Sequence, residues 1–157
     1  LSTEESETRQ RLHEVTVVLM EWCVKHNAPV SQALWQYNLI ALKGLAKLYH
    51  SQKDLQRARQ MLEKAVHYEM KAIAKDQVLS VTATFNALAQ LCVELQDSDE
   101  ALHHYQRALA FQQQSLEADN PLIIATLQNM AHLYARCNMY HGALTLFHHI
   151  LILQDSR

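Results

Sequence analysis

The side chains best suited to metal binding or acid–base chemistry are histidines, of which the 157-residue sequence has ten. Two adjacent pairs, His103-His104 and His148-His149, lie at similar places in successive stretches of helical pattern. Adjacent residues of a helix point about 100° apart, so each pair turns only one ring toward a given neighbour, and a metal ion would need further ligands. We therefore predict no metal site, and we interpret these histidines as exposed or half-buried residues of a helix surface.

Carboxylates and thiols also perform chemistry, but their placement here favours structural roles. Asp97, Asp99 and Glu100 lie at the expected start of a helix, where acidic groups satisfy free backbone amides and the helix dipole. The cysteines are widely separated and lack the CxxC spacing of zinc and redox sites: Cys23, Cys92 and Cys137. We interpret them as small buried side chains of a protein in a reducing compartment. The only glycines, Gly44 and Gly142, are too far apart to form a phosphate loop. We expect no enzyme activity and no cofactor.

The composition narrows the class of protein further. Apolar residues make up 49% of the chain, and it has only two glycines and two prolines, so long helices are expected rather than strands. Fourteen basic residues against 16 acidic ones give a net charge of −2, which favours neither nucleic acid nor an anionic membrane as a partner. No apolar stretch is long enough to span a bilayer, and we expect a cytoplasmic location. Because the chain begins at Leu1 rather than Met, we interpret it as a fragment of a longer protein.

Three similar segments recur at an interval of about 42 residues. They are Gly44-Leu-Ala-Lys-Leu-Tyr49, Ala87-Leu-Ala-Gln-Leu-Cys92 and Asn129-Met-Ala-His-Leu-Tyr134. A second small residue follows the central alanine twelve positions later, at Ala58, Ala101 and Ala143. A third mark comes seven positions after that, at Ala65, Ala108 and Ile150. Internal repetition at this interval indicates a stack of similar structural units.

Each unit has the apolar spacing of two helices joined by a short polar link. In the first helix of the first unit, apolar residues recur at the helical spacing i, i+3, i+4, i+7: Leu42, Leu45, Ala46 and Tyr49. Small and bulky residues alternate in the second helix, which lets two antiparallel helices approach closely. We predict an all-α, right-handed α-solenoid of about seven helices in one continuous domain. Its repeats are expected at residues 35–75, 78–118 and 121–155.

This pattern resembles the tetratricopeptide repeat, whose 34-residue unit has small residues at the same spacing. The longer interval is similar to the repeats of the kinesin light chain and nephrocystin-like groups. The best local match is Asn120-Pro121, followed by the segments 125–134 and 140–143. Ile150 departs from the family pattern, since a small residue is usual there. The resemblance covers residues 35–157 and implies a non-catalytic scaffold or adaptor that binds other proteins.

Residues 1–28 form one further predicted helix. Ser2 and Thr3 stand before an acidic first turn, which is typical of a helix start. An apolar stripe follows and ends before Pro29: Leu12, Val15, Leu19 and Trp22. The helix is either a cap or, as we favour, the second half of a degenerate repeat, because Thr16 and Cys23 fall one interval before Ala58 and Ala65. Ser31 is the predicted cap of the next helix.

Stacked hairpins present a concave groove lined by their first helices. Polar and cationic residues lie on the side of these helices turned away from the core: Lys43, Lys47, Asn86, Gln90, Gln128, Asn129, His132 and Arg136. Amides donate and accept hydrogen bonds, and cations pair with carboxylates, so we expect the groove to bind an extended, acidic peptide. The alternative interpretation is a solvated helix face without a ligand.

The resemblance also implies two kinds of peptide partner. Some tetratricopeptide repeats bind the acidic C-terminus of chaperones through a clamp of lysines and asparagines, and Lys43 and Asn129 occupy clamp-like positions. Lys47, Ala87 and Ala125 depart from that clamp, so we rank chaperone docking lower. Kinesin light chain relatives bind short linear motifs, and Asn86 and Asn129 match part of their groove pattern.

The last predicted helix is apolar on nearly every side, with Leu144, Phe147, Leu151 and Leu153 as its large apolar residues. Solenoids normally end in a polar cap. Either further repeats cover this helix, or it pairs with another copy of the chain or a different protein. Oligomerisation through these residues is therefore the alternative function.

Overall fold

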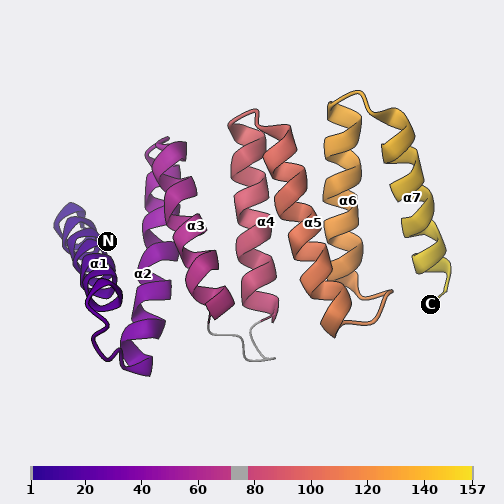
Figure 1. Ribbon diagram of the computed structural model, residues 1–157. Coiled ribbons are helices and arrows are strands. Elements are labelled where there is room, and N and C mark those ends of the chain that lie inside the picture. Colours follow the sequence, from indigo (N-terminus) through magenta and orange to yellow (C-terminus); the bar gives the residue numbers. More distant parts are fainter. Residues whose placement is uncertain (1, 72–77, 157) are drawn as a thin grey trace. The chain divides into compact units, whose positions relative to one another are not determined.

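The computed structural model describes residues 2–71 and 78–156, and within those residues every regular element is an α-helix (Figure 1). The helices are α1 (Thr3–Lys25), α2 (Gln32–Ser51), α3 (Leu55–Lys71), α4 (Val78–Glu94), α5 (Ser98–Ser115), α6 (Pro121–Arg136) and α7 (Tyr140–Asp155). The predicted all-α fold of helical hairpins is confirmed. The handedness of the stack, its continuity as one domain and the repeat limits 35–75, 78–118 and 121–155 stay predictions. Residues 72–75 of the first repeat lie outside the described part.

The helices fall into two compact units. The first unit, Leu1–Glu69, holds α1, α2 and most of α3. The second unit, Met70–Arg157, holds α4 to α7. Within the second unit α5 packs against both α4 and α6, and α6 packs against α7. The candidate site lies in this second unit.

Side chains just before five of the helices accept hydrogen bonds from the first turn, and one of them is Asp54, which accepts from the Arg57 amide at the start of α3. Ser31 Oγ accepts from the Leu34 amide at 3.1 Å, which confirms Ser31 as the cap of α2. Asp97 accepts from the Glu100 amide at the start of α5, so the acidic cluster there has the structural role predicted. Ser2 and Asn120 cap α1 and α6 in the same way. The N-terminal ends of these helices are therefore set by local sequence.

Three turns between paired helices share one backbone geometry. Lys53, Gln96 and Asn138 have φ values of 64°, 62° and 60°, in the left-handed region that non-glycine residues seldom adopt. The next amide in each turn donates to the carbonyl five residues earlier, at 2.8 to 2.9 Å. This is the bond pattern of a Schellman motif, which ends a helix. The three residues are 43 and 42 positions apart, so the repeat interval seen in the sequence is also the interval of this turn.

The core of the second unit follows the predicted small-residue register. The four alanines of that register in α4, α5 and α6 are fully buried: Ala89, Ala101, Ala108 and Ala131. Larger side chains such as Phe85, Tyr105 and Met130 fill the space between the helices. The small residues allow the close helix approach, and the large ones remove water from between the repeats.

Helix α1 buries a different face from the one expected. The predicted stripe is 47% to 64% exposed: Leu12, Val15, Leu19 and Trp22. The buried residues are Val17, Met20 and Cys23. Because residues 12–24 are apolar at most positions, their spacing fits more than one helical face. Contact with α2 selects the face that is buried. Whether α1 belongs to a degenerate repeat stays a prediction.

Candidate functional site

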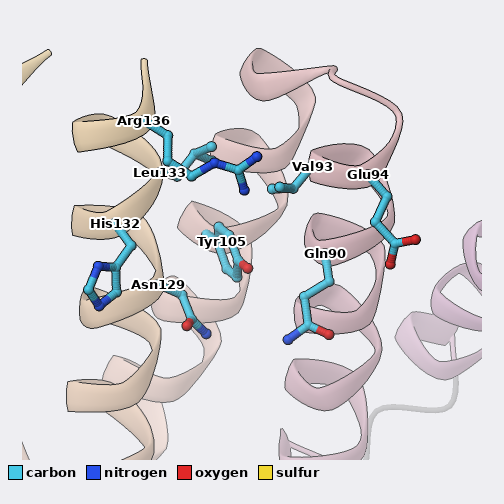
Figure 2. Close-up of a pocket in the computed structure, with 8 residues that line it drawn as sticks. All are labelled: Gln90, Val93, Glu94, Tyr105, Asn129, His132, Leu133 and Arg136. Carbon is cyan, nitrogen blue, oxygen red and sulfur yellow. The ribbon is translucent and has the colours of Figure 1, made fainter. Parts of the chain in front are cut away.

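One cavity in the second unit is lined by side chains from three helices (Figure 2). It has a volume of about 350 Å³ and is bounded by α4, α5 and α6. The lining residues are Gln90, Val93, Glu94, Tyr105, Asn129, His132, Leu133 and Arg136. Four of them belong to the predicted peptide-binding set: Gln90, Asn129, His132 and Arg136. The structure therefore gathers half of that set around a single cavity.

The two walls of the cavity come from corresponding helices of neighbouring hairpins. On α4, Gln90 and Glu94 are four residues apart and so share one helical face. On α6, the same face carries Asn129, His132 and Arg136. Figure 2 shows the side chains of Gln90 and Asn129 pointing toward one another across the cavity, while Arg136 extends from α6 toward the α4 side. Two amides and one guanidinium thus face a common space.

The floor of the cavity is aromatic and apolar. Tyr105, from α5, and Leu133, from α6, are both buried. Burial raises the pKa of Tyr105 above its ordinary value of 10.0, because the phenolate would be poorly solvated there. The phenol therefore stays neutral at physiological pH and can both donate and accept a hydrogen bond. The floor offers apolar contact, and the walls offer polar contact.

Sequence reasoning missed Val93, Glu94, Tyr105 and Leu133 as parts of the site. Tyr105 and Leu133 fit the core pattern, and nothing in their spacing shows that one edge of each also faces a cavity. Glu94 carried a usable signal, since it is an acidic residue at the last position of a helix. A carboxylate is unfavourable there because it lies at the negative end of the helix dipole.

The remaining residues of the predicted set do not line this cavity. Asn86 and Gln128 are half-buried, one on α4 and the other on α6. The Asn86 Oδ1 atom is buried, without a hydrogen-bond partner among the described residues. Lys47 is exposed on α2, in the first unit. Their part in peptide binding stays a prediction.

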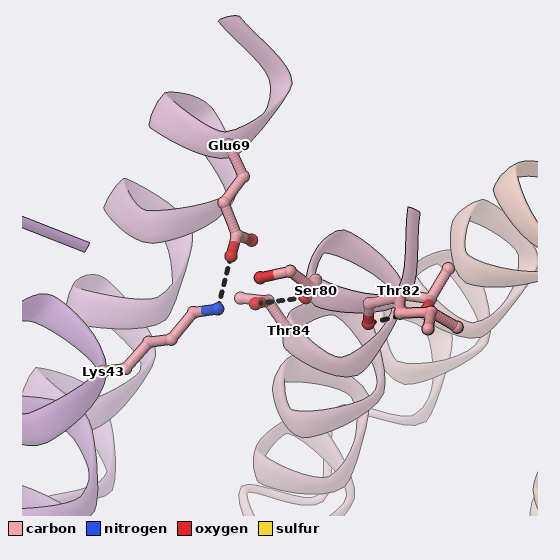
Figure 3. Close-up of polar contacts among 6 residues, drawn as sticks. Lys43, Glu69, Ser80, Thr82 and Thr84 are labelled. Carbon is pink, nitrogen blue, oxygen red and sulfur yellow. Dashed lines mark hydrogen bonds and ion pairs between the residues drawn. The ribbon is translucent and has the colours of Figure 1, made fainter. Parts of the chain in front are cut away.

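Lys43 has a partner within the first unit that the sequence did not indicate. Its ammonium forms an ion pair with Glu69 of α3, whose side chain is only 1% exposed (Figure 3). Figure 3 also shows hydroxyls of α4 bonded within their own helix, with Thr84 Oγ1 donating to the Ser80 carbonyl at 3.0 Å. Lys43 therefore stabilises a buried carboxylate, a role distinct from the predicted contact with a ligand.

The face of α2 near Gly44 is covered by α1. Gly44 holds the repeat position that Asn129 holds on α6, and a Cβ atom there would lie 2.8 Å from His13 Cε1. The absence of a side chain at Gly44 lets the His13 ring approach α2. Burial, with the charge of Arg9, lowers the pKa of His13 below 6.5. In the first unit, the His13 ring therefore occupies the space beside Gly44. The corresponding space beside Asn129, in the second unit, is part of the open cavity.

Helix α7 exposes only part of the predicted oligomerisation set. Leu144 and Leu151 are 67% and 57% exposed. Phe147 and Leu153 instead pack against a buried cluster that includes Ile123 and Ile150. The exposed apolar face is therefore formed by Leu144 and Leu151 together with Tyr140, which lies on the same side of the helix.

Among residues 2–71 and 78–156, no three His, Cys, Asp or Glu side chains are placed to hold a metal ion. Of the adjacent histidine pairs, His103, His148 and His149 are exposed, as expected. His104 is buried, which corrects its interpretation as a surface residue. Cys23 and Cys92 are buried and Cys137 is half-buried, and none of these three cysteines forms a disulfide. No helix in the described ranges is both long and apolar enough to cross a bilayer.

Comparison with known protein families gives two matches of one kind. Residues 39–67 and residues 80–151 each match a family model described as tetratricopeptide repeat. Together the two matches cover most of the chain between α2 and α7. A comparison with curated proteins gave no match.

Solved structures support the same fold. Two crystal structures of a proposed kinesin light chain of Podosopora anserina, with nearly identical TPR-like repeats, match with TM-scores of 0.65 and 0.68. Their identities are 22% and 19%, and the matches cover 76% and 98% of this chain. BtubC (BKLC) of P. vanneervenii matches over 94% of this chain with a TM-score of 0.66 and 16% identity. The chain spans 56% of the first structure, 70% of the second and 56% of BtubC. At these identities the likeness concerns the fold.

Proposed function

Because the chain belongs to the tetratricopeptide repeat family, we propose that it binds an extended, acidic peptide in the cavity between α4 and α6. Repeats of this family are in general protein-interaction modules without catalysis. The observation that carries the proposal is the convergence of Gln90, Asn129 and Arg136 on one cavity with an apolar floor. This cavity is called the α4–α6 groove below.

The groove has the groups that an extended peptide requires. An extended backbone exposes amides and carbonyls that find no partner within the peptide itself. Gln90 and Asn129, placed on opposite walls, each offer a donor and an acceptor for those groups. Arg136 offers a planar guanidinium that binds a carboxylate through two parallel hydrogen bonds. The peptide would lie over Tyr105, whose ring supplies apolar contact area.

The other predicted residues have unequal places in this proposal. Lys47, Asn86 and Gln128 stay candidates for contacts with a longer ligand. Lys43 is a weaker candidate for contact with the peptide, because its ammonium already pairs with Glu69. Docking of chaperones through a carboxylate clamp is a weaker hypothesis for the same reason, since Lys43 is one of the two residues in clamp-like positions. A cytoplasmic location is part of the proposal and accords with three cysteines that form no disulfide.

Peptide binding by groove variants tests the proposal. The probe is a mixture of fluorescein-labelled decapeptides with a fixed Asp at the centre, and the readout is fluorescence anisotropy. We expect Arg136→Ala to weaken binding about tenfold, which corresponds to about 1.4 kcal/mol for a charge-assisted contact. Gln90→Ala and Asn129→Ala should each weaken it about two- to tenfold.

Two control variants lie outside the groove. Gln106→Ala removes an exposed amide from α5, and Arg11→Ala removes an exposed cation from α1. Both should leave the affinity unchanged. Equal losses in groove and control variants would show that the peptides bind by general charge attraction, and full affinity in Arg136→Ala would overturn the proposed site.

Self-association through α7 is the second candidate, favoured by the exposed apolar face of Tyr140, Leu144 and Leu151. Light scattering across a range of concentrations gives the mass, which is 18.1 kDa for the monomer. If α7 joins two copies, Leu144→Glu with Leu151→Glu abolishes the larger species. Ile40→Glu, on an equally exposed residue of α2, should leave that species intact. A monomer at every concentration would remove this candidate.

A further inference from the structure

The α4–α6 groove has hydrogen-bond donors on three sides. Gln90 lies on the α4 wall, and Asn129 and Arg136 lie on the α6 wall. Tyr105 forms part of the floor and comes from α5. In Figure 2 the Tyr105 hydroxyl points into the space between the two amides and the Arg136 guanidinium. Donors from three helices therefore surround one cavity.

The hydroxyl of Tyr105 stands at a position where the repeat pattern is otherwise apolar. The equivalent residues are Leu62, 43 positions earlier in α3, and Phe147, 42 positions later in α7. Packing at this position therefore needs only an apolar side chain. A hydroxyl removed from water costs free energy unless it forms a hydrogen bond, and Tyr105 is only 4% exposed. Since Tyr105 lines the cavity, a ligand there can supply that bond.

The direction of the donors distinguishes two kinds of anion. A carboxylate is planar and has two oxygens, whereas a phosphate monoester is tetrahedral and has three terminal oxygens. A guanidinium such as that of Arg136 binds two oxygens of either group through parallel hydrogen bonds. Only the phosphate offers a third oxygen, which lies out of the plane of those two bonds. A donor that approaches from another helix, as Tyr105 does, suits this third oxygen.

We propose that the α4–α6 groove selects a peptide whose acidic residue is a phosphorylated serine or threonine. This inference rests on the proposed peptide binding and names the kind of acidic residue that is bound. Arg136 holds two phosphate oxygens, and the Tyr105 hydroxyl donates to the third. The amides of Gln90 and Asn129 bind the peptide backbone on either side of the phosphorylated residue.

The charges around the groove are compatible with a phosphate. Burial raises the pKa of Tyr105, so the phenol keeps its proton at neutral pH and donates to an anion instead of repelling it. Glu94 also lines the cavity, but Figure 2 shows its carboxylate pointing away from the space between Gln90 and Asn129. We assign no phosphate contact to His132, because its ring packs against the ring of Phe147, with 5.5 Å between the centroids.

The test uses four fluorescein-labelled mixtures of decapeptides that differ only at the centre, which is phosphoserine, serine, one aspartate or two adjacent aspartates. Two aspartates match the charge of phosphoserine, which is about −1.5 to −2 at pH 7. Affinities for the 157-residue chain are measured by anisotropy at one ionic strength. The phosphoserine mixture should bind about tenfold more tightly than the single-aspartate mixture and about three- to fivefold more tightly than the double-aspartate mixture. The serine mixture should bind most weakly.

Variants that lose one hydroxyl then assign this preference. Tyr105→Phe should weaken phosphoserine binding about three- to tenfold, and should change single-aspartate binding less than about twofold. This variant should fold, because phenylalanine already occupies the equivalent position of the next repeat as Phe147. The matched control is Tyr134→Phe, which removes the hydroxyl of a half-buried tyrosine of α6 that does not line the cavity. The control should change neither affinity.

Two failures are distinguishable. If neither the phosphoserine mixture nor the single-aspartate mixture binds the wild-type chain, the proposed peptide binding itself is wrong. If the aspartate mixture binds and responds to Arg136→Ala, but phosphoserine binds no better than two aspartates, the phosphate inference is wrong and peptide binding stands. A phosphoserine preference that survives Tyr105→Phe would also overturn the inference, because the contact to the third oxygen would then be absent.

Discussion

Replacing Gly44 by alanine has two opposing effects on the stability of the first unit, and both come from the Cβ atom that the substitution adds to α2. In a helix interior, alanine is more favourable than glycine by about 1 kcal/mol. The new Cβ would lie 2.8 Å from His13 Cε1 and 2.9 Å from His13 Nδ1, closer than such contacts allow. The imidazole must therefore leave its place between α1 and α2. Overpacking of this kind costs about 1–3 kcal/mol, so we expect Gly44→Ala to change stability by between about 0 and 2 kcal/mol in the unfavourable direction.

The coupling between the two residues can be isolated. In a His13→Ala background the obstacle is absent, and Gly44→Ala should stabilise by about 1 kcal/mol. Urea unfolding followed by tryptophan fluorescence reports on this part of the chain, because Trp22 and Trp35 are its only tryptophans and both lie in the first unit. The double-mutant cycle should give a coupling of about 1–3 kcal/mol.

Gly142 provides the matched control. A Cβ atom there would meet Tyr134 Cδ1 at 3.4 Å, an ordinary van der Waals distance. Gly142→Ala should therefore stabilise the second unit by up to about 1 kcal/mol, measured by circular dichroism. The reasoning is refuted if Gly44→Ala stabilises the first unit to the same extent with and without His13, since the ring would then not occupy the space that the structure assigns to it.

Three further predictions concern stability. Lys43→Met should destabilise the first unit by about 2 kcal/mol. This is less than the about 3–5 kcal/mol expected for a fully buried pair, because the Lys43 side chain is 33% exposed. Adding Glu69→Gln to Lys43→Met should recover part of the loss, as measured by tryptophan-detected urea unfolding. Gln96→Gly should stabilise the second unit by about 1 kcal/mol by relieving a positive φ, whereas Asn138→Gly should change it less, since asparagine tolerates that region; circular dichroism melts compare the two. The pKa of His13 is below 6.5 in the folded state, so the unfolded state binds more protons as the pH falls through 6.5. The first unit should therefore lose stability as the pH falls through that value. His13→Gln should make the urea midpoint less dependent on pH.

The helices, their caps and their buried small residues could be predicted from residue types and spacing. The small residues Ala89, Ala101 and Ala131 were expected in the core, and all are fully buried. The caps Ser31 and Asp97 were expected at helix starts, and both accept the amide hydrogen bonds of a cap. These features depend on residues within about one turn of each other, or on a register that repeats along the chain. A single sequence contains both kinds of information.

The site could be predicted only in part. The residues turned away from the core included Gln90, Asn129, His132 and Arg136, and the structure places these four on one cavity. The angular position of a residue on its helix is what periodicity reports. It does not report which other helix the residue faces. The sequence therefore predicted Asn86 and Gln128 as site residues on the same grounds, although they do not line the cavity.

The pairings between helices were decided by tertiary structure. The apolar residues of α1 fitted two faces equally, and contact with α2 buries Val17, Met20 and Cys23 while leaving Trp22 exposed. Lys43 had the spacing of a groove residue, but Glu69 comes to its ammonium from another helix, 26 residues later in the chain. The sequence by itself therefore determined the helices, their ends and the face that each repeat buries, because these depend on short spacings. Which charges meet, and which polar faces enclose a cavity, depends on how separate helices pack, and only the tertiary structure decided it.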